Sequence, residues 1–357
     1  MTSPSSRRAH VVGLGLIGGS VALALRDAGW RVTGEDRDPQ AVATARQRGV
    51  VDDGGLDVDV DLVVVATPAG SVVEVVDRVL SVLTRSDAIV TDVAGVKSHI
   101  VESIRDPRFL GGHPMAGSEQ RGVAASRGDL FRECTWVLTP TATTPPELYT
   151  ALHGVWREVG ARVLAISADD HDRLVAMASH VPHLLAGALM NEVAVAAQTD
   201  AVLLQLAAGG FRDMTRVAAG DPTIWPDILV ENREAITRAL DGVLTRLRAL
   251  RSAVGDADRS RLTDALTSAA RARRALPGRA LHTEDLGYIR VGLADRPGQL
   301  ATVTTVASDL AVNIFDIEIA HDIEGLAGTL LLAVDAAGLD LLAVALAERG
   351  FTVSRER

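Results

Sequence analysis

The feature that most constrains the fold is a glycine-rich turn near the start of the chain. Residues 9–12 are predicted to form a strand and residues 18–28 a helix, and the sequence between them, at 13–18, is Gly-Leu-Gly-Leu-Ile-Gly. The first glycine of such a turn permits tight bending, the second lets the backbone approach a pyrophosphate, and the third packs helix against strand. The helix N-terminus then faces the phosphate charge. The predicted cofactor contacts in this turn are Gly13, Gly15, Leu16, Ile17 and Gly18.

Further cofactor contacts are expected where the following strands end. Asp36 lies eighteen positions after Gly18, at the end of the second expected strand. Its carboxylate can accept hydrogen bonds from the adenosine ribose and would repel a 2′-phosphate, which favours NAD over NADP. Arg37 beside it could instead hold such a phosphate. Thr67 and Pro68 follow the third expected strand, and they either face the nicotinamide half of the cofactor or form a simple strand-ending turn.

The first half of the chain alternates short β-branched runs with helical patterns. Such alternation predicts an α/β fold with a doubly wound Rossmann sheet, whose ligand lies at the carboxyl ends of the strands. The last two strands are expected to complete the same sheet. The expected strands are 9–12, 31–34, 61–66, 88–91, 109–112, 136–139 and 161–164, and the expected helices are 18–28, 39–48, 71–83, 97–104 and 146–159. Together they define an NAD-binding domain at 1–166.

The strand patterns stop at residue 167, and an all-α domain is expected over 167–280. Apolar residues recur at helical spacing within 169–197. Because this stretch is apolar enough to need a partner surface, we expect a homodimer built through these helices. The other expected helices of this domain are 201–206, 222–254 and 257–275.

The tail, residues 286–357, is expected to be a separate module. A linker with proline, glycine and mixed charge precedes it at 277–287. The order strand, helix, strand, strand, helix, strand is typical of a ferredoxin-like βαββαβ unit. The expected strands are 288–294, 313–321, 329–334 and 352–354, and the expected helices are 298–310 and 339–349.

The bulk properties narrow the class of partner and the compartment. The 357 residues carry a formal net charge of −10, which argues against nucleic acid as a general partner. Cys134 is the only cysteine, as expected in a reducing compartment. Residues 1–10 lack the apolar core of a signal peptide, and glycine, proline or charge breaks every apolar run before about 18 residues. We therefore expect a cytoplasmic protein without a membrane segment.

His113 is the candidate catalytic residue. It lies in the run Gly-Gly-His-Pro-Met-Ala-Gly-Ser-Glu at 111–119, about a hundred residues after the glycine turn. Histidine, with an ordinary pKa near about 6.5, suits a base that takes a hydroxyl proton while hydride leaves the neighbouring carbon. The glycines and Pro114 around it can hold the ring in place. The two motifs together predict a dehydrogenase.

Three other polar clusters admit both a functional and a structural explanation. His180 and His183 share a helix face, but no third and fourth ligand with suitable spacing accompanies them, so buried histidines are favoured over a metal site. Ser118 lacks the G-x-S-x-G context of a hydrolase nucleophile. Arg216 could clamp a substrate carboxylate, although composition alone favours a structural salt bridge with Asp213.

In combination, the motifs resemble the prephenate and arogenate dehydrogenase family over nearly the whole chain. They occur in the order GLGLIGGS, DVAGVK, GGHPMAGSE, SHVPH, GGFRDMTR and DPTIW, and residues 289–300 resemble the start of an ACT regulatory domain. The resemblance implies NAD-dependent oxidative decarboxylation of prephenate to 4-hydroxyphenylpyruvate, a step of tyrosine biosynthesis. Arogenate, in which an amino group replaces the keto group, and NADP remain open as alternatives.

The resemblance also implies roles for single residues. His113 would take the proton of the ring hydroxyl, and Arg216 would hold the ring carboxylate. His183 would contact the substrate side chain, with Trp225 nearby. The ionic network around the entrance and the arginine would contain Glu119 and Asp213.

One position departs from the family pattern. The family usually has a serine where this chain has Gly95, and that hydroxyl would help to orient the substrate hydroxyl beside the catalytic histidine. Its task would pass to water, to Ser98 or to Lys97. The departure keeps a different class of function open, namely a catalytically silent amino-acid sensor. A 3-hydroxyacid dehydrogenase is disfavoured, because the lysine it needs on the long helix is replaced by His180 and His183.

The resemblance to an ACT domain implies an amino-acid effector. Tyrosine is the usual effector and binds at an interface between two such domains; a dimerisation module that binds nothing is the alternative. The expected effector contacts are Asp295, Arg296, Pro297, Gly298 and Asn313.

Overall fold

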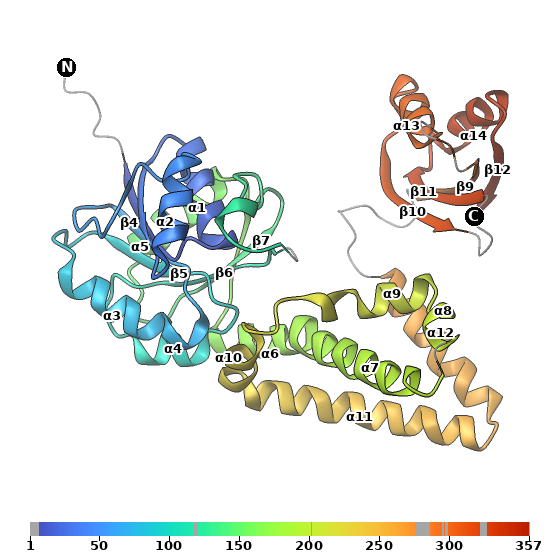
Figure 1. The fold of residues 1–357 in the computed structure, drawn as a ribbon, viewed down its shortest axis with the longest axis horizontal. Coiled ribbons are helices and arrows are strands. Elements are labelled where there is room, and N and C mark those ends of the chain that lie inside the picture. Colours follow the sequence, from blue (N-terminus) through green and yellow to red (C-terminus); the bar gives the residue numbers. More distant parts are fainter. Residues whose placement is uncertain are drawn as a thin grey trace. The chain divides into compact units, whose positions relative to one another are not determined.

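The computed structural model describes residues 7–117, 120–200, 202–275, 286–294, 296, 299–321 and 327–356 (Figure 1). The chain forms two compact units, Met1–Leu244 and Thr245–Arg357, and each is described by itself. Five residues singled out from the sequence lie outside the described residues: Ser118, Glu119, Asp295, Pro297 and Gly298.

The first unit contains a parallel five-stranded sheet in the order β3-β2-β1-β4-β5. Its strands are β1 (Arg8–Val12), β2 (Arg31–Glu35), β3 (Asp53–Gly54), β4 (Leu62–Val65) and β5 (Ile89–Asp92). All four residues of β4 are buried, as expected for a central strand covered on both faces. The Rossmann-like sheet predicted from the glycine turn is therefore present.

Alternate residues of β4 face two separate hydrophobic cores. Leu62 and Val64 pack with α1 (Leu16–Asp27) and α5 (Pro146–Glu158). Val63 and Val65 pack in a second core with α3 (Val72–Val82) and α4 (Ser98–Ser103). The remaining helix of this part is α2 (Pro39–Gln47). Because side chains alternate along a strand, the two cores lie on opposite faces of the sheet.

The last three expected strands form a sheet of their own, which corrects the single sheet predicted from the sequence. They are β6 (Gly111–Pro114), antiparallel to β7 (Thr135–Thr139), which is parallel to β8 (Arg162–Ala165). Phe109 makes one isolated parallel bridge to Val90 of β5. Beyond it, the Gly112 N–H donates to the Asp92 carboxylate (3.1 Å) instead of a backbone carbonyl, so the ladder between β5 and β6 is not continued.

The helical part begins with α6 (Ala168–Val175), which passes through a π-helical turn at Ala176–His180 into α7 (Val181–Ala197). Pro182 has no N–H to continue the regular ladder, which accounts for the irregular turn within the expected single helix. Where one helix was expected over 222–254, the chain breaks at Asn232. The remaining helices are α8 (Val202–Gln205), α9 (Gly209–Thr215), α10 (Trp225–Glu231), α11 (Arg233–Gly255) and α12 (Arg259–Arg274).

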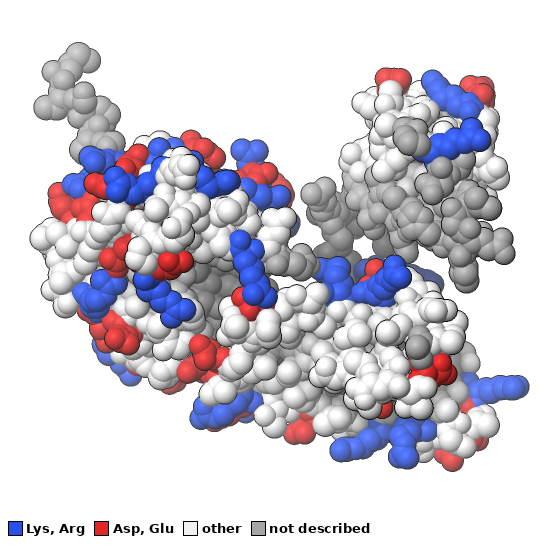
Figure 2. Space-filling view, in the orientation of Figure 1, with Lys and Arg blue, Asp and Glu red and all other residues white. Residues whose placement is uncertain are grey.

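The helical part exposes many apolar side chains. In α7 only Val181 and Ala186 are buried, and Figure 2 shows a face with few charged side chains over this helix. The stretch Ala168–Ala197 is long and apolar enough to cross a bilayer by length and composition alone, a test that core helices of soluble proteins also pass. An exposed apolar surface of this kind usually contacts a partner, as the sequence pattern indicated.

In the second unit, the tail has the predicted βαββαβ order. Its antiparallel sheet has the order β10-β11-β9-β12, and a separate core that includes Ile289, Leu332 and Leu346 holds it together. The elements are β9 (Leu286–Ala294), α13 (Gln299–Asp309), β10 (Ile314–His321), β11 (Ala327–Asp335), α14 (Leu339–Glu348) and β12 (Thr352–Glu356).

Candidate active site

The glycine turn between β1 and α1 has the shape that a dinucleotide needs. Gly13 has a φ of +94°, and a Cβ atom there would lie 2.5 Å from the Ala66 carbonyl oxygen. A Cβ atom at Gly18 would clash with the Gly13 carbonyl oxygen, whereas one at Gly15 would meet nothing within 4 Å. The first and third glycines are thus required by packing, and the second leaves open space for a ligand.

A cavity of about 660 Å³ lies beside this turn and extends to the end of β2. Its lining includes Asp36, Arg37, Thr67 and Pro68, as predicted for the cofactor. The Asp36 carboxylate accepts hydrogen bonds from the Leu14 and Asp38 N–H groups, at 2.7 and 2.9 Å, which fix its orientation. Sequence reasoning missed two further lining residues, Glu35 and Arg78, which form an ion pair.

A second cavity, of about 640 Å³, shares Gly15 and Gly122 with the first. It joins the glycine turn to Arg216, His183 and Trp225 from the helical part. The His183 and Trp225 rings stack with centroids 3.5 Å apart. Three residues distant in the sequence thus meet the cofactor turn at one cavity.

Two other residues of this cavity had not been predicted. Arg121 and Asp221, which both line it, form a salt bridge of 3.2 Å. By contrast, Asp213 lies exposed on α9 and is not among the lining residues. Among the described residues, no group of three or more histidine, cysteine, aspartate or glutamate side chains is arranged to hold a metal ion.

His113 is half-buried within β6, at one end of a chain of polar side chains. Its Nδ1 atom is 2.8 Å from Nε2 of His171, and Nδ1 of His171 is 2.8 Å from Oδ1 of Asp172. The Asp172 carboxylate also accepts hydrogen bonds from the N–H groups of Lys97 and Ser98, both at 2.8 Å. His171 and Lys97 are completely buried.

Neither Lys97 nor His113 is among the lining residues of the two cavities, but His113 is half-buried, whereas the complete burial of Lys97 contradicts its predicted place among the substrate contacts. Its ammonium group is fully buried and paired with the Asp92 carboxylate. Asp92 in turn accepts hydrogen bonds from the N–H groups of Gly112 and Ala94. The pair therefore anchors the strand that carries His113, and burial prevents direct contact with a substrate.

The electrostatic surroundings keep His113 neutral. Burial is the main cause that lowers the pKa of His113 well below its usual value; the nearby His171, Lys97 and His180 side chains lower it further, and the charge of Asp172 opposes them. Burial opposes ionisation of Asp172 itself, but hydrogen bonds from His171 and Ser98 outweigh this effect and lower the pKa of its carboxyl. A neutral imidazole beside a carboxylate is the combination that a general base needs.

Gly95, the residue at the serine position of the family pattern, lies directly against the His113 ring. A Cβ atom at Gly95 would be 3.7 Å from both Cε1 and Nε2 of His113, an ordinary contact distance. The Nε2 edge of His113 therefore faces an open backbone position.

The polar residues that sequence reasoning missed behind His113 are Asp92, His171 and Asp172. Asp92 begins the DVAGVK motif directly at a strand end, which is a usable signal for a functional carboxylate. His171 and Asp172 directly follow the acidic residues of the first turn of α6, a pattern that normally indicates a solvated helix N-terminus.

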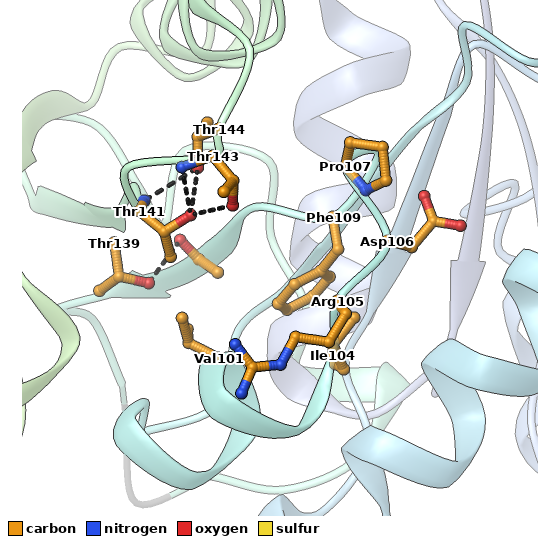
Figure 3. Close-up of a pocket in the computed structure, with 11 residues that line it drawn as sticks. Val101, Ile104, Arg105, Asp106, Pro107, Phe109, Thr139, Thr141, Thr143 and Thr144 are labelled. Atoms are coloured by element: carbon orange, nitrogen blue, oxygen red, sulfur yellow. Dashed lines mark hydrogen bonds between the residues drawn. The ribbon is translucent and has the colours of Figure 1, made fainter.

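A small hollow of about 70 Å³ between α4 and β7 is separate from this site (Figure 3). Arg105 and several threonines border it, and the Thr141 hydroxyl lies 3.0 Å from that of Thr143 and 3.2 Å from that of Thr144. Because these hydroxyls satisfy one another, the hollow presents no polar group that requires a ligand.

Two family models match the chain. Residues 21–165 match "Prephenate dehydrogenase, nucleotide-binding domain", and residues 167–268 match "Prephenate dehydrogenase, dimerization domain".

Curated relatives extend the match. The prephenate dehydrogenase of Bacillus subtilis is 31% identical over 338 residues, which cover 90% of this chain and 91% of the relative. The cyclohexadienyl dehydrogenase of Zymomonas mobilis is 32% identical over 278 residues, 74% of this chain and 94% of the relative.

Solved structures agree with these matches. The Aquifex aeolicus prephenate dehydrogenase in complex with hydroxyphenyl propionate and NAD⁺ has a TM-score of 0.72 and 31% identity, and the match covers 77% of this chain and all of that one. The Synechocystis arogenate dehydrogenase has a TM-score of 0.64 and 31% identity, with 75% and 99% coverage.

Proposed function

The chain belongs to the prephenate dehydrogenase family, and from this premise we propose how its two cavities and the half-buried His113 carry out the reaction. The protein is an NAD-binding prephenate dehydrogenase of tyrosine biosynthesis. In this reaction hydride leaves the ring carbon that bears the hydroxyl, and CO₂ leaves the carbon opposite. The ring becomes aromatic, which drives the step, and 4-hydroxyphenylpyruvate is formed.

The cavity beside the glycine turn fits the dinucleotide. The open space at Gly15 admits the pyrophosphate to the N-terminus of α1, and Asp36 accepts hydrogen bonds from the adenosine ribose. When bound, the nicotinamide supplies the hydride acceptor. Asp36 also disfavours a 2′-phosphate through charge repulsion, so NAD⁺ is preferred over NADP⁺.

The observation that carries the assignment is the cavity that joins Gly15 to Arg216, His183 and Trp225. Prephenate is a dianion, and a guanidinium group can hold the ring carboxylate through paired hydrogen bonds. His183 and Trp225 form a flat wall against which the pyruvyl side chain rests. The ring carboxylate and the pyruvyl side chain, both on the carbon opposite the hydroxyl, are thus held while the ring lies beside the cofactor turn.

His113 is the general base of the proposed mechanism. In its neutral form the Nε2 atom takes the hydroxyl proton as hydride leaves the same carbon. The lowered pKa of His113 keeps this form present at neutral pH, and activity is lost as the pH falls through that pKa. The absence of a serine hydroxyl at Gly95 leaves the orientation of the substrate hydroxyl to His113 and to water.

Assembly and regulation are part of the same proposal. The exposed apolar side chains of the helical part, together with the match to a dimerization domain, support a homodimer in the cytoplasm. The βαββαβ tail supports an ACT-type regulatory domain that binds an amino acid, L-tyrosine in the first instance. Of its expected contacts, Arg296 and Asn313 are exposed and so accessible to a ligand.

Steady-state rates with prephenate and arogenate, each with NAD⁺ and NADP⁺, test the proposal. We expect turnover of prephenate with NAD⁺; turnover of arogenate with NADP⁺ alone would overturn both the substrate and the cofactor assignment. A protein that binds NAD⁺ and tyrosine but turns over neither substrate would be the amino-acid sensor. Calorimetry of the full chain with tyrosine and with phenylalanine tests the effector separately.

A further inference from the structure

We propose that His171 is a positioning residue, whose Nε2 atom accepts the Nδ1 proton of His113 and thereby keeps the Nε2 lone pair of His113 available to the substrate hydroxyl. The inference rests on the proposed role of His113 as the base. Family matches and motifs assign no role to His171. The observations that carry it are two contacts of 2.8 Å in a row, a buried carboxylate, and the complete burial of the His171 ring between His113 and Asp172.

The hydrogen-bond partners determine which nitrogen carries each proton. An ionised carboxylate only accepts, so Nδ1 of His171 must donate to Asp172. The other nitrogen of the neutral His171 ring, Nε2, is then an acceptor. The 2.8 Å contact with His113 therefore requires a proton on Nδ1 of His113, and the neutral ring has its lone pair on Nε2.

The opposite tautomer of His113 is disfavoured by this arrangement. It would place two nitrogen lone pairs 2.8 Å apart in a buried site, with no proton between them. The two rings meet edge to face, with centroids 5.0 Å apart and an interplanar angle of 72°, which is the orientation in which an N–H on one ring points at the edge nitrogen of the other. Because His171 is fully buried, water cannot supply the missing donor.

Asp172 orients His171 and does not itself take the proton. Its carboxylate receives three hydrogen bonds, from the His171 ring and from the N–H groups of Lys97 and Ser98. These contacts join α6 to the segment at the start of α4. Lys97 in that segment lies seventy-five positions before Asp172 in the sequence. The Asn232 side chain donates a hydrogen bond to the Asp172 carbonyl at 2.8 Å and lies 3.3 Å from Nδ1 of His180. Asp172 is therefore fixed through its carbonyl as well as through its carboxylate.

Two substitutions of His171 separate tautomer control from simple packing. His171→Asn retains an amide near the Nδ1 position, which can still donate to Asp172, but offers nothing to His113. His171→Gln extends a carbonyl oxygen towards the Nε2 position and can accept the Nδ1 proton of His113. We expect kcat with prephenate and NAD⁺ to fall roughly ten- to a hundredfold in the Asn variant, with KM within about twofold. The Gln variant should recover kcat to within about threefold of wild type.

The pH profile supplies a readout that packing alone would not move. The groups that face His113 are His171 and Asp172 from α6, Lys97 before α4 and His180 from the π-helical turn, with Asp92 of β5 behind Lys97. Burial is the main cause that lowers the pKa of His113, and replacement of His171 by the smaller Asn admits water, so the pKa of His113 rises. The pH below which kcat declines should therefore be higher in the Asn variant than in the wild type. His99→Asn, on the exposed face of α4, is the matched control and should leave both kcat and this pH unchanged.

Nitrogen NMR of the full-length wild-type protein labelled at histidine tests the tautomer without any variant, because ring-nitrogen shifts distinguish protonated from unprotonated atoms. The His113 signals, identified by their loss in His113→Asn, should show a proton on Nδ1 and none on Nε2. A proton on Nε2, or a folded Asn variant with unchanged kcat and pH profile, overturns the inference. A wild-type enzyme that turns over no prephenate contradicts the proposed function instead, and the NMR result still decides the tautomer.

Discussion

The two sides of the proposed site are built in opposite ways. His113 lies in a strand, and the polar groups behind it are buried and hydrogen-bonded, with Asp172 only 5% exposed. Arg216 lies in an exposed turn between short helices, near apolar side chains such as Met214 that are 61% exposed. A base must be held in one orientation and one protonation state, whereas a residue that binds an entering dianion must be accessible. In the proposed site, the side that would do the chemistry is hydrogen-bonded to buried groups, and the side that would recognise the substrate is exposed.

The comparison predicts, first, that removal of the base affects the chemical step far more than binding. His113→Asn should lower kcat by about 10²- to 10⁴-fold, the usual contribution of a general base, while the Kd for NAD⁺ stays within about twofold. Stopped-flow or steady-state rates with prephenate, together with calorimetric NAD⁺ binding, measure the two effects. A variant with near wild-type kcat would show that the rigid side is structural only.

The second prediction concerns the accessible side. Arg216→Ala should raise KM for prephenate about ten- to a hundredfold, because a charge-assisted hydrogen bond contributes about 1.5–3 kcal/mol. Its effect on kcat should be smaller than that of His113→Asn, since the base is untouched. Arg212→Ala, an exposed arginine one turn earlier on α9, is the matched control. If the KM values of the two variants were alike, Arg216 would have no role in holding the ring carboxylate.

The two sides also differ in how far the sequence predicts them. The glycine turn, the parallel sheet and the order of the tail follow from local patterns, and the cavity with Arg216, His183 and Trp225 agrees with the family resemblance. The chain behind His113 could not be predicted, because Asp172 meets Lys97 only through packing of α6 against α4. In the sequence, residues 169–172 have the composition of a solvated helix start. Burial, which a local pattern does not contain, changes their function.

For the same reason, Lys97 was misplaced. A lysine next to a catalytic motif suggests contact with an anionic substrate, but its burial lowers the pKa of the ammonium group, an effect that the attraction of Asp92 opposes. The separate sheet of β6, β7 and β8 also could not be predicted from local patterns, because it depends on a tertiary contact. The bond from Gly112 to the Asp92 carboxylate ends the pairing with β5, and this contact again depends on tertiary structure.

The smallest predicted effect lies on the His113 side, at Gly95, which faces the His113 ring. Its backbone is not in the left-handed region, and an added Cβ atom would lie 3.7 Å from Nε2 of His113, so a serine fits without strain. Its hydroxyl can reach the Nε2 edge and orient the substrate hydroxyl. Because one hydrogen bond contributes about 0.5–1.5 kcal/mol, Gly95→Ser should raise kcat/KM by about two- to tenfold.

Gly95→Ala separates the hydroxyl from the added carbon. It fills the same space but offers no hydrogen bond, so kcat/KM should stay within about twofold of wild type. If the alanine and serine variants gained equally, closer packing against His113 would be the cause. If the serine variant lost activity, its hydroxyl would compete with the substrate for Nε2, and the open backbone at Gly95 would then be part of how this enzyme leaves its rigid base accessible.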